Sequence, residues 1–322
     1  MKLLFVHAHP DDEAIWTGGL AAQAARAGAE VTVVTCTLGE LGEVIGEPYQ
    51  GLVAERSDQL GGFRIAELTR SLRALGANGP DHQPLFLGGA GRWRDSGMAG
   101  AASNADPRAF IHSGAAAVAQ LQELLERLQP DVVITYDADG GYGHPDHIRA
   151  HDIVVAACAD RYATLWAVTD QARLEAGLQA ITAIPPQWSQ AGVGDIAAAD
   201  AEYEVALDEV SLSRKCAAMR HHATQIWMGD GGVSAVNPHA AWGQVDESGR
   251  ARGVWALSNL ICQPVVPWEG YRVGTADRGC LQALRELVGL RECATEPGAR
   301  PGLDSFRGEV ETSIAVSESI GE

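Results

Sequence analysis

The chain has 322 residues, of which 46% are hydrophobic, enough for one large domain or two smaller ones with a sizeable core. Lysine and arginine number 24 against 42 aspartates and glutamates, which gives a net charge of −18. This balance excludes a non-specific nucleic-acid binder and a peripheral membrane protein, because both need a positive surface to meet phosphates. The net charge does not exclude an anionic ligand that is bound in a local pocket.

The sequence shows no targeting segment and no paired cysteines. The first apolar run, residues 3–6, is shorter than the roughly 7–15 apolar residues of a secretory signal. No stretch approaches the roughly 18 consecutive apolar residues of a membrane span. The six cysteines are scattered without a C-x-x-C pair, which is typical of reduced thiols: Cys36, Cys158, Cys216, Cys262, Cys280 and Cys293. We expect a cytoplasmic protein with no membrane and no nucleic-acid partner.

The first half of the chain alternates short apolar runs with segments of helical periodicity. The alternation predicts strands at residues 3–6, 31–35, 84–87, 131–136 and 164–168, and helices at about 19–27, 53–75, 107–129 and 145–159. In the third helix, Asp106 is the expected N-cap and Pro107 the first helical residue. Strands and helices that alternate in this way form a mostly parallel sheet with helices on both faces. The expected fold class is therefore α/β, with a Rossmann-like core.

The pattern changes after residue 195. Strands are predicted at 202–207 and 253–266, with one helix at 211–225, which indicates a smaller α+β portion that completes or caps the core. We expect a single catalytic domain over residues 1–293, with the core at 1–170 and the smaller portion at 195–293. Residues 294–322 contain proline, glycine and serine but few large apolar residues, which predicts a disordered tail.

Two polar segments follow the ends of the first and fourth predicted strands. Residues 7–13 are HAHPDDE, and residues 136–147 are YDADGGYGHPDH. Each contains His-Pro-Asp, and each leads from a strand into a helix. Because ligands of an open parallel sheet bind beyond the carboxyl ends of its strands, the two segments predict one shared site. Helix caps and turn formers would explain one such segment alone, but two matching segments at one edge favour a functional site.

The histidines and aspartates of these segments have the spacing of metal ligands. His9 and Asp12 are three residues apart across a proline turn, so both can face one cavity. His144 and His147 have the same spacing, and a helix that begins directly after His144 turns His147 towards the first segment. His151, one helical turn later, forms an alternative pair with His147. A catalytic zinc site takes about three such ligands and leaves a position open for water.

A strand that ends in AHPDDE, with a later GHPDH, resembles the LmbE-like superfamily of zinc-dependent N-deacetylases, which includes the GlcNAc-PI de-N-acetylases. Within it, the chain is most similar to the deacetylases of mycothiol biosynthesis. This resemblance extends to VTCTLGE at 34–40, QLGGFR at 59–64, residues 88–100 and ALSN at 256–259, and so covers most of residues 1–265. It implies a metal-dependent hydrolase that removes acetate from an N-acetylglucosaminyl-inositol.

The resemblance also implies roles for single residues. One zinc ion per subunit would be held by His9, Asp12 and His147, with Asp11 as the general base. Iron(II) suits two histidines and one carboxylate as well as zinc does. His144 would stabilise or protonate the transition state, because an amide needs a polarised carbonyl and a proton for its departing amine.

Four neighbouring residues receive roles from their chemistry. Asp146 would orient the ring of His144, or else cap the helix that follows. Tyr142 would donate its hydroxyl to the oxyanion, or else pack as an aromatic side chain in its glycine-rich loop. We interpret His7 as a core histidine and Glu13 as a first-turn carboxylate favoured by the helix dipole.

Substrate recognition is assigned to Arg64 and Asp95. The resemblance places both at positions that the family uses for sugar and inositol hydroxyls, and charged planar groups bind vicinal diols well. The alternative for the loop at 91–98 is a surface loop held by local salt bridges. The sequence has no G-x-G-x-x-G after a strand and no P-loop, so we expect no nucleotide cofactor.

These expectations combine into one predicted function. The chain would be a zinc-dependent N-deacetylase that hydrolyses 1D-myo-inositol 2-acetamido-2-deoxy-α-D-glucopyranoside and releases acetate. One alternative is a mycothiol S-conjugate amidase, and another is a non-catalytic sugar- or metal-binding protein. Asp11 argues against the last of these, because a binding site needs no second carboxylate beside the ligand Asp12. The expected partner is a small amino-sugar inositol glycoside, and the sequence predicts no oligomeric state.

Overall fold

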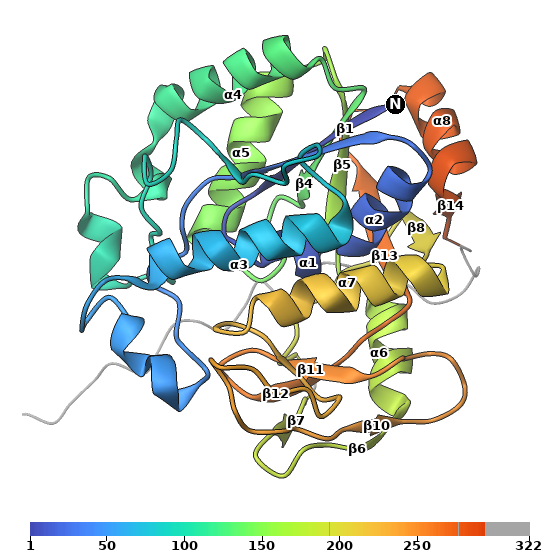
Figure 1. Ribbon diagram of the computed structural model, residues 1–322. Coiled ribbons are helices and arrows are strands. Elements are labelled where there is room, and N and C mark those ends of the chain that lie inside the picture. The colour runs from blue at the N-terminus through green and yellow to red at the C-terminus, as the bar shows by residue number, and fades with distance from the viewer. Residues whose placement is uncertain (193, 276, 294–322) are drawn as a thin grey trace, which may run out of the picture.

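An eight-stranded main sheet runs through the centre of the protein (Figure 1). The computed structural model describes residues 1–192, 194–275 and 277–293. In order across the sheet, the strands are β14 (Arg291–Glu292), β8 (Tyr203–Ala206), β13 (Trp268–Val273), β5 (Ala163–Val168), β4 (Val132–Tyr136), β1 (Lys2–His7), β2 (Glu30–Thr35) and β3 (Leu85–Phe86). The strands from β5 to β3 pair in parallel, whereas β13, β8 and β14 pair antiparallel. The predicted α/β class with a mostly parallel core is confirmed.

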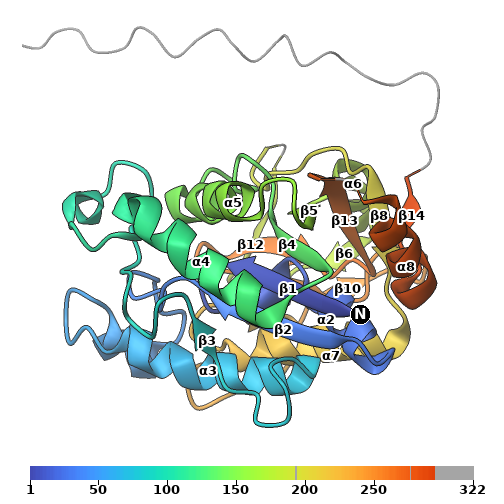
Figure 2. The ribbon, with the colours of Figure 1, turned by 90° about the horizontal axis from the view of Figure 1, so that it is seen from above.

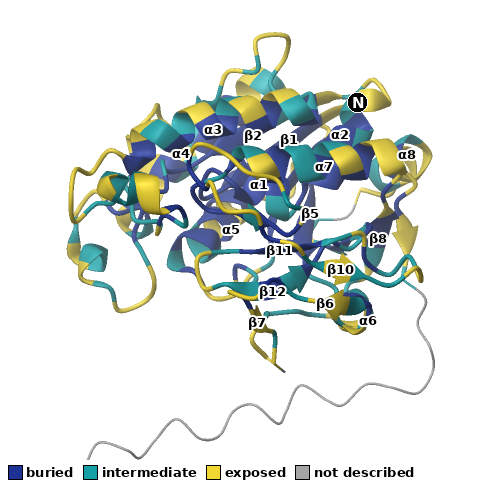
Figure 3. Ribbon diagram, turned by 60° about the horizontal axis from the view of Figure 1, so that its bottom comes forward, coloured by how far each residue is buried: buried dark blue, intermediate teal, exposed yellow. Residues whose placement is uncertain are grey.

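Helices cover both faces of the main sheet because its central strands are apolar on both sides (Figure 2). Along β1, Leu3 and Phe5 belong to one buried cluster, and Leu4 and Val6 belong to another. The first cluster is completed by α2 (Gly18–Arg26), α3 (Leu60–Leu75), α7 (Glu209–His221) and α8 (Arg278–Val288), and the second by α4 (Gly114–Leu128) and α5 (Pro145–Cys158). Figure 3 shows the consequence: the outer faces of these helices are exposed while the strands are buried.

The second half of the chain divides between the main sheet and a separate small sheet. β8, β13 and β14 extend the main sheet, whereas the small sheet has the order β7-β12-β11-β9. Its strands are β7 (Ser189–Gln190), β12 (Ile261–Pro264), β11 (Val254–Ala256) and β9 (Trp227–Met228), and beside it lie α6 (Gln171–Gln179) and the pair β6 (Ile181–Ala183) and β10 (Gln244–Val245). The small sheet packs around its own buried cluster, which includes Trp188, Val254 and Ala256.

Three predicted elements have different limits in the structure. The helix expected from residue 53 begins at Leu60, after a 3-10 turn at Glu47–Leu52 and a left-handed backbone at Asp58 (φ 53°). The helix expected from Pro107 begins at Gly114, because the carboxylate and carbonyl of Asp106 accept the N–H groups of Arg108 and Ala109 in a turn. The strand expected at 253–266 is the hairpin β11–β12.

Two further expectations concern the membrane and the C-terminus. Within the described ranges, no helix combines the length and apolar character needed to cross a bilayer. The tail predicted at residues 294–322 lies outside the described residues.

Candidate active site

The two His-Pro-Asp segments meet where the main sheet reverses its strand order. β1 and β4 are neighbours; β2 and β3 continue the sheet beyond β1, and β5 continues it beyond β4. Doubly wound sheets bind ligands at the position where the strand order reverses in this way. The first segment leads into the four-residue helix α1 (Asp12–Ile15), and the second leads into α5. A cavity of about 640 Å³ lies at this point, and His9, Asp11 and His144 line it.

Three side chains of these segments meet at one point: the two imidazole nitrogens face each other, and each faces a different oxygen of Asp12. His9 Nδ1 lies 3.2 Å from His147 Nε2 and 3.4 Å from Asp12 Oδ2, and His147 Nε2 lies 3.4 Å from Asp12 Oδ1. Ligand atoms on a tetrahedral zinc ion with bonds of about 2.0–2.1 Å are about 3.3 Å apart. The donor types and the nitrogen–nitrogen distance therefore suit a tetrahedral divalent metal ion, with Asp12 as the neighbouring carboxylate.

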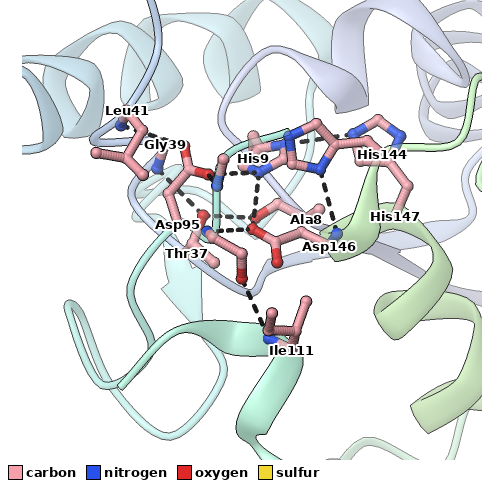
Figure 4. Close-up of polar contacts among 12 residues, drawn as sticks. Ala8, His9, Thr37, Gly39, Leu41, Asp95, Ile111, His144, Asp146 and His147 are labelled. Atoms are coloured by element: carbon pink, nitrogen blue, oxygen red, sulfur yellow. Dashed lines mark hydrogen bonds and ion pairs between the residues drawn. The ribbon is translucent and has the colours of Figure 1, made fainter. Parts of the chain in front are cut away.

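The hydrogen bonds of the two histidines direct one nitrogen of each ring toward Asp12 and fix the other nitrogen on an oxygen acceptor. His147 Nδ1 lies 3.0 Å from the carbonyl oxygen of Gly140, to which it donates, so Nε2 keeps its lone pair. His9 Nε2 lies 3.2 Å from Asp146 Oδ2 and donates there, which leaves Nδ1 as the ligand atom (Figure 4). Carboxylate and carbonyl partners of this kind orient histidine ligands in metal sites.

The position of the Asp146 carboxylate corrects one expectation. We expected it to orient the ring of His144, but Asp146 Oδ2 contacts His9 and accepts the backbone N–H of Ser96 at 2.9 Å. Asp146 meets His144 through its own backbone N–H, which donates to His144 Nδ1 at 3.1 Å. The physical reason is that α5 begins at Pro145, so the side chain of His144, not that of Asp146, caps this helix.

Two wider groups of ligand-type atoms share His9. Among the described residues, one group contains His9, His144 and His147, and the other contains His9, Asp95 and Asp146. Within each group, the ligand-type atoms lie within 4.8 Å of one another. In the first group, His144 Nδ1 is occupied by a backbone N–H. In the second group, the nitrogen of His9 that faces the carboxylates is the one that donates to Asp146. We favour His9, Asp12 and His147, because Nδ1 of His9 and Nε2 of His147 face each other and each faces an oxygen of Asp12.

Asp11 stands beside this group in a strained backbone conformation. Its φ of 123° lies where residues other than glycine are rare, and such strain persists only where the surroundings impose it. Arg64 Nη2 lies 3.0 Å from Asp11 Oδ2, and the Asp11 N–H donates to Glu13 Oε2 at 2.9 Å. Burial raises the pKa of the Asp11 carboxyl to about 6, against the opposing charge of Arg64 and with the added repulsion of Asp12.

Glu13 does more than favour the helix dipole. It is buried, and its Oε1 accepts hydrogen bonds from His222 Nε2 at 2.6 Å and from Ser71 Oγ. The N–H of Asp11 is therefore held by a carboxylate that is itself anchored to α3 and to the C-terminal end of α7. The only sequence signal for this role is that Glu13 follows two functional carboxylates.

In the metal-free chain, the surroundings of Asp12 and of His144 shift the pKa values of both groups downward. Burial raises the pKa of Asp12, but the charges and hydrogen bonds of His147 and His9 outweigh it and hold that pKa well below its ordinary value. Burial, together with the charges of His9 and His147, lowers the pKa of His144 to about 3. His144 is therefore neutral, and because its Nδ1 accepts a hydrogen bond, its proton lies on Nε2.

Comparisons with known proteins give this geometry a family. Residues 4–158, which contain both segments, match the GlcNAc-PI de-N-acetylase family. Over 276 residues the chain is 58% identical to the 1D-myo-inositol 2-acetamido-2-deoxy-α-D-glucopyranoside deacetylase of Corynebacterium diphtheriae, covering 85% of this chain and 92% of that protein. The chain belongs to the GlcNAc-PI de-N-acetylase family. The predicted family membership is confirmed.

Two more proteins are similar to this de-N-acetylase family member. The deacetylase of the same name from Nocardia farcinica is 48% identical over 295 residues, covering 86% of this chain and 91% of that protein. The solved structure of the zinc inhibited form of teicoplanin deacetylase Orf2 is 18% identical, with a TM-score of 0.46, covering 70% of this chain and 84% of that one.

The predicted substrate-binding residues of this de-N-acetylase family member lie at the same cavity. Arg64 is buried, and besides Asp11 its guanidinium contacts the carbonyl oxygens of Gly39 and Pro10. Asp95 is also buried, and its carboxylate lies 3.6 Å from His9 Nε2 (Figure 4). Both side chains therefore support catalytic-site groups as well as lining the cavity.

Three aromatic side chains complete the account of the predicted residues. Tyr142 is 47% exposed, and its ring centroid lies 5.0 Å from that of His147, at the wall of the cavity. His151 donates from Nδ1 to the carbonyl of Tyr136 at 2.9 Å, and it belongs to neither group of ligand-type atoms found in the described residues. His7 is buried against Thr17, as expected for a core histidine.

Proposed function

We propose that this chain is a metal-dependent deacetylase that hydrolyses the acetamide of 1D-myo-inositol 2-acetamido-2-deoxy-α-D-glucopyranoside, releasing acetate and the free amine. The observation that carries the proposal is the buried Asp11 carboxylate beside the His9–Asp12–His147 group, in a chain 58% identical to a deacetylase of that name. A carboxyl group with a raised pKa beside a ligand carboxylate is typical of catalysis and not of binding alone.

The proposed cofactor is one zinc ion per chain. His9 Nδ1, His147 Nε2 and an oxygen of Asp12 would hold it, since the two nitrogens have the spacing of ligands in a tetrahedral site and each faces the Asp12 carboxylate. When bound, zinc polarises a substrate carbonyl and lowers the pKa of water to about 7. Iron(II) accepts the same three ligands, so the activity assay compares the chain loaded with zinc and the chain loaded with iron(II).

Asp11 would act as the general base that takes the proton of the attacking water. Arg64 and the N–H bond to Glu13 hold its carboxylate and its backbone in one orientation, which is what a positioned base needs. A pKa near 6 leaves Asp11 ionised at neutral pH but more basic than an exposed aspartate. Once protonated, the same carboxyl can return the proton to the departing amine.

His144 would stabilise the carbonyl oxygen as that oxygen gains negative charge. Its ring is neutral, with the proton on Nε2, and its centroid lies 4.6 Å from that of His9. A neutral N–H donor aimed at a developing oxyanion lowers the barrier without giving up its proton. Of the two roles expected for His144, stabilisation and protonation, these contacts favour stabilisation.

The charges around the cavity suit an uncharged glycoside. The guanidinium of Arg64 is paired with Asp11, so it is not free to neutralise a phosphorylated substrate. Asp95 and Tyr142 line the same cavity and offer oxygen atoms to hydroxyl groups. A cavity of about 640 Å³ is within the range that small-molecule sites occupy.

The test is acetate release by purified chain loaded with one equivalent of zinc or, anaerobically, of iron(II). We expect equal amounts of acetate and free amine from the inositol glycoside. A higher kcat/KM for a mycothiol S-conjugate would support the amidase alternative instead. Zinc-loaded protein that released no acetate from any N-acetylglucosaminide would leave only the sugar- or metal-binding alternative.

A further inference from the structure

Tyr136 is a fully buried residue at the carboxyl end of β4, and its side chain contacts two of the three proposed metal ligands. Its hydroxyl donates to Asp12 Oδ2 at 2.6 Å and accepts the backbone N–H of Ala8 at 2.8 Å. Its ring stacks on that of His147, with centroids 4.1 Å apart and planes 13° apart. The sequence placed Tyr136 at the end of a strand and the start of the second polar segment, but gave it no role of its own.

The hydroxyl determines which oxygen of Asp12 is available. Asp12 Oδ2 receives both the Tyr136 hydroxyl and the backbone N–H of His9, the latter at 2.8 Å. Asp12 Oδ1 faces His147 Nε2 at 3.4 Å. Two donors on one oxygen prevent rotation of the carboxylate about its Cβ–Cγ bond, so Oδ1 stays directed at the ligand group.

The ring of Tyr136 restrains the other ligand. Stacking against one face of the imidazole limits rotation of His147, while the bond from Nδ1 to the Gly140 carbonyl limits its tilt. The carbonyl of Tyr136 also accepts a hydrogen bond from His151 Nδ1 at 2.9 Å, which ties the end of β4 to α5. The tyrosine is thus restrained at its hydroxyl, its ring and its backbone.

We infer that Tyr136 is a positioning residue for the metal site, whose hydroxyl orients Asp12 and whose ring orients His147. The inference rests on the proposed function, because it assumes that these side chains bind the metal. Residues that orient metal ligands typically change metal affinity by 10–100-fold when they are removed.

The experiment compares Tyr136→Phe with Tyr271→Phe, using zinc as the probe. Tyr271 is a matched control because it is equally buried and donates its hydroxyl to a carboxylate, Glu269 Oε2, at 2.9 Å. Zinc affinity is measured by competition with a chromogenic chelator, and folding by the thermal midpoint of the metal-free proteins. We expect Tyr136→Phe to weaken zinc binding by 10–100-fold and Tyr271→Phe to change it by less than threefold. Equal affinities of the two variants would overturn the inference.

A second comparison separates positioning from general packing. In an Asp12→Asn background, the hydroxyl of Tyr136 has no carboxylate to orient, so adding Tyr136→Phe should weaken zinc binding by less than threefold. An unchanged 10–100-fold effect in that background would overturn the inference. Zinc binding is read without substrate, so a wild-type chain that binds zinc but releases no acetate defeats the proposed function alone.

Discussion

Replacing Asp11 by asparagine should lower kcat by at least about 100-fold while making the metal-free protein more stable. Asparagine has the same shape as aspartate and is likewise enriched among residues with positive φ, so the backbone at φ 123° is retained. Only the charge and the basicity are removed. Loss of a general base lowers kcat by about 10²–10⁴-fold, or about 3–5 kcal/mol in the barrier.

The gain in stability follows from the raised pKa of Asp11. In the folded, metal-free chain this pKa is about 6 against an ordinary 3.8, so the ionised carboxylate destabilises the fold. The difference of about two pKa units corresponds to about 3 kcal/mol at pH 7.5 and about half of that at pH 5, and it vanishes below the ordinary pKa. Asparagine resembles the protonated form, so the free energy of unfolding should rise by these amounts.

The assay is urea unfolding of chelator-treated protein at pH 7.5 and pH 5, together with acetate release by the zinc-loaded protein. Asp58→Asn is the matched control, because Asp58 also has a positive φ (53°) and an arginine partner, Arg94, at 2.8 Å, but is exposed and outside the site. The reasoning is refuted if Asp11→Asn keeps more than a tenth of kcat, or if its metal-free form is less stable than wild type at pH 7.5.

Other substitutions test the ligand group and its supports. His147→Ala should lose bound zinc in equilibrium dialysis while His151→Ala retains it, because His151 is held by the carbonyl of Tyr136; equal zinc contents would contradict the ligand assignment. At Gly140 (φ 67°) an added Cβ would lie 2.7 Å from His147 Cβ, so Gly140→Ala should weaken zinc binding at least tenfold. Gly143 (φ 81°) is the control, because an added Cβ there would have no neighbouring atom within 4 Å. Gly143→Ala should lower the free energy of unfolding by only about 1 kcal/mol and leave zinc affinity unchanged. Identical zinc affinities of the two variants would contradict this contrast. Chelation should stop acetate release and lower the thermal midpoint, and zinc should restore both, whereas activity that survives full metal removal would exclude a metal-dependent reaction.

The candidate site was predictable where its residues lie close to strand ends. His9 and Asp12 closely follow β1, and His147 lies in the first turn of the helix that follows β4, so the rule for parallel sheets was sufficient to place them together. Their roles as ligands stay predictions, as do the cytoplasmic location and the absence of nucleic-acid and membrane partners. The mostly parallel sheet was predictable from the alternation of apolar runs with helices, because such a sequence has few other ways to bury its apolar strands.

The remaining contacts depend on side chains that the chain brings from far away. Glu13 meets His222, which is 209 residues later, and no periodicity signals such a pair. Asp146 faces His9 instead of His144 because the backbone N–H of Ser96, from a separate loop, holds its carboxylate. Strands of two residues, such as β9, leave no recognisable alternation, so the small sheet was visible only in part.

Helix α1 carries both Asp11 at its N-cap and the proposed ligand Asp12, and one contact that holds it comes from the second half of the chain. All three proposed ligands lie within the first 147 residues, whereas Lys215 Nζ, which donates to the carbonyl of Ile15 at 2.6 Å and pairs with Glu269, belongs to the C-terminal half. At about 5–20 residues per second, the segment from His147 to Glu269 takes roughly 6–24 s to synthesise. All three proposed ligands are therefore synthesised well before the Lys215–Glu269 pair that holds the C-terminal end of α1.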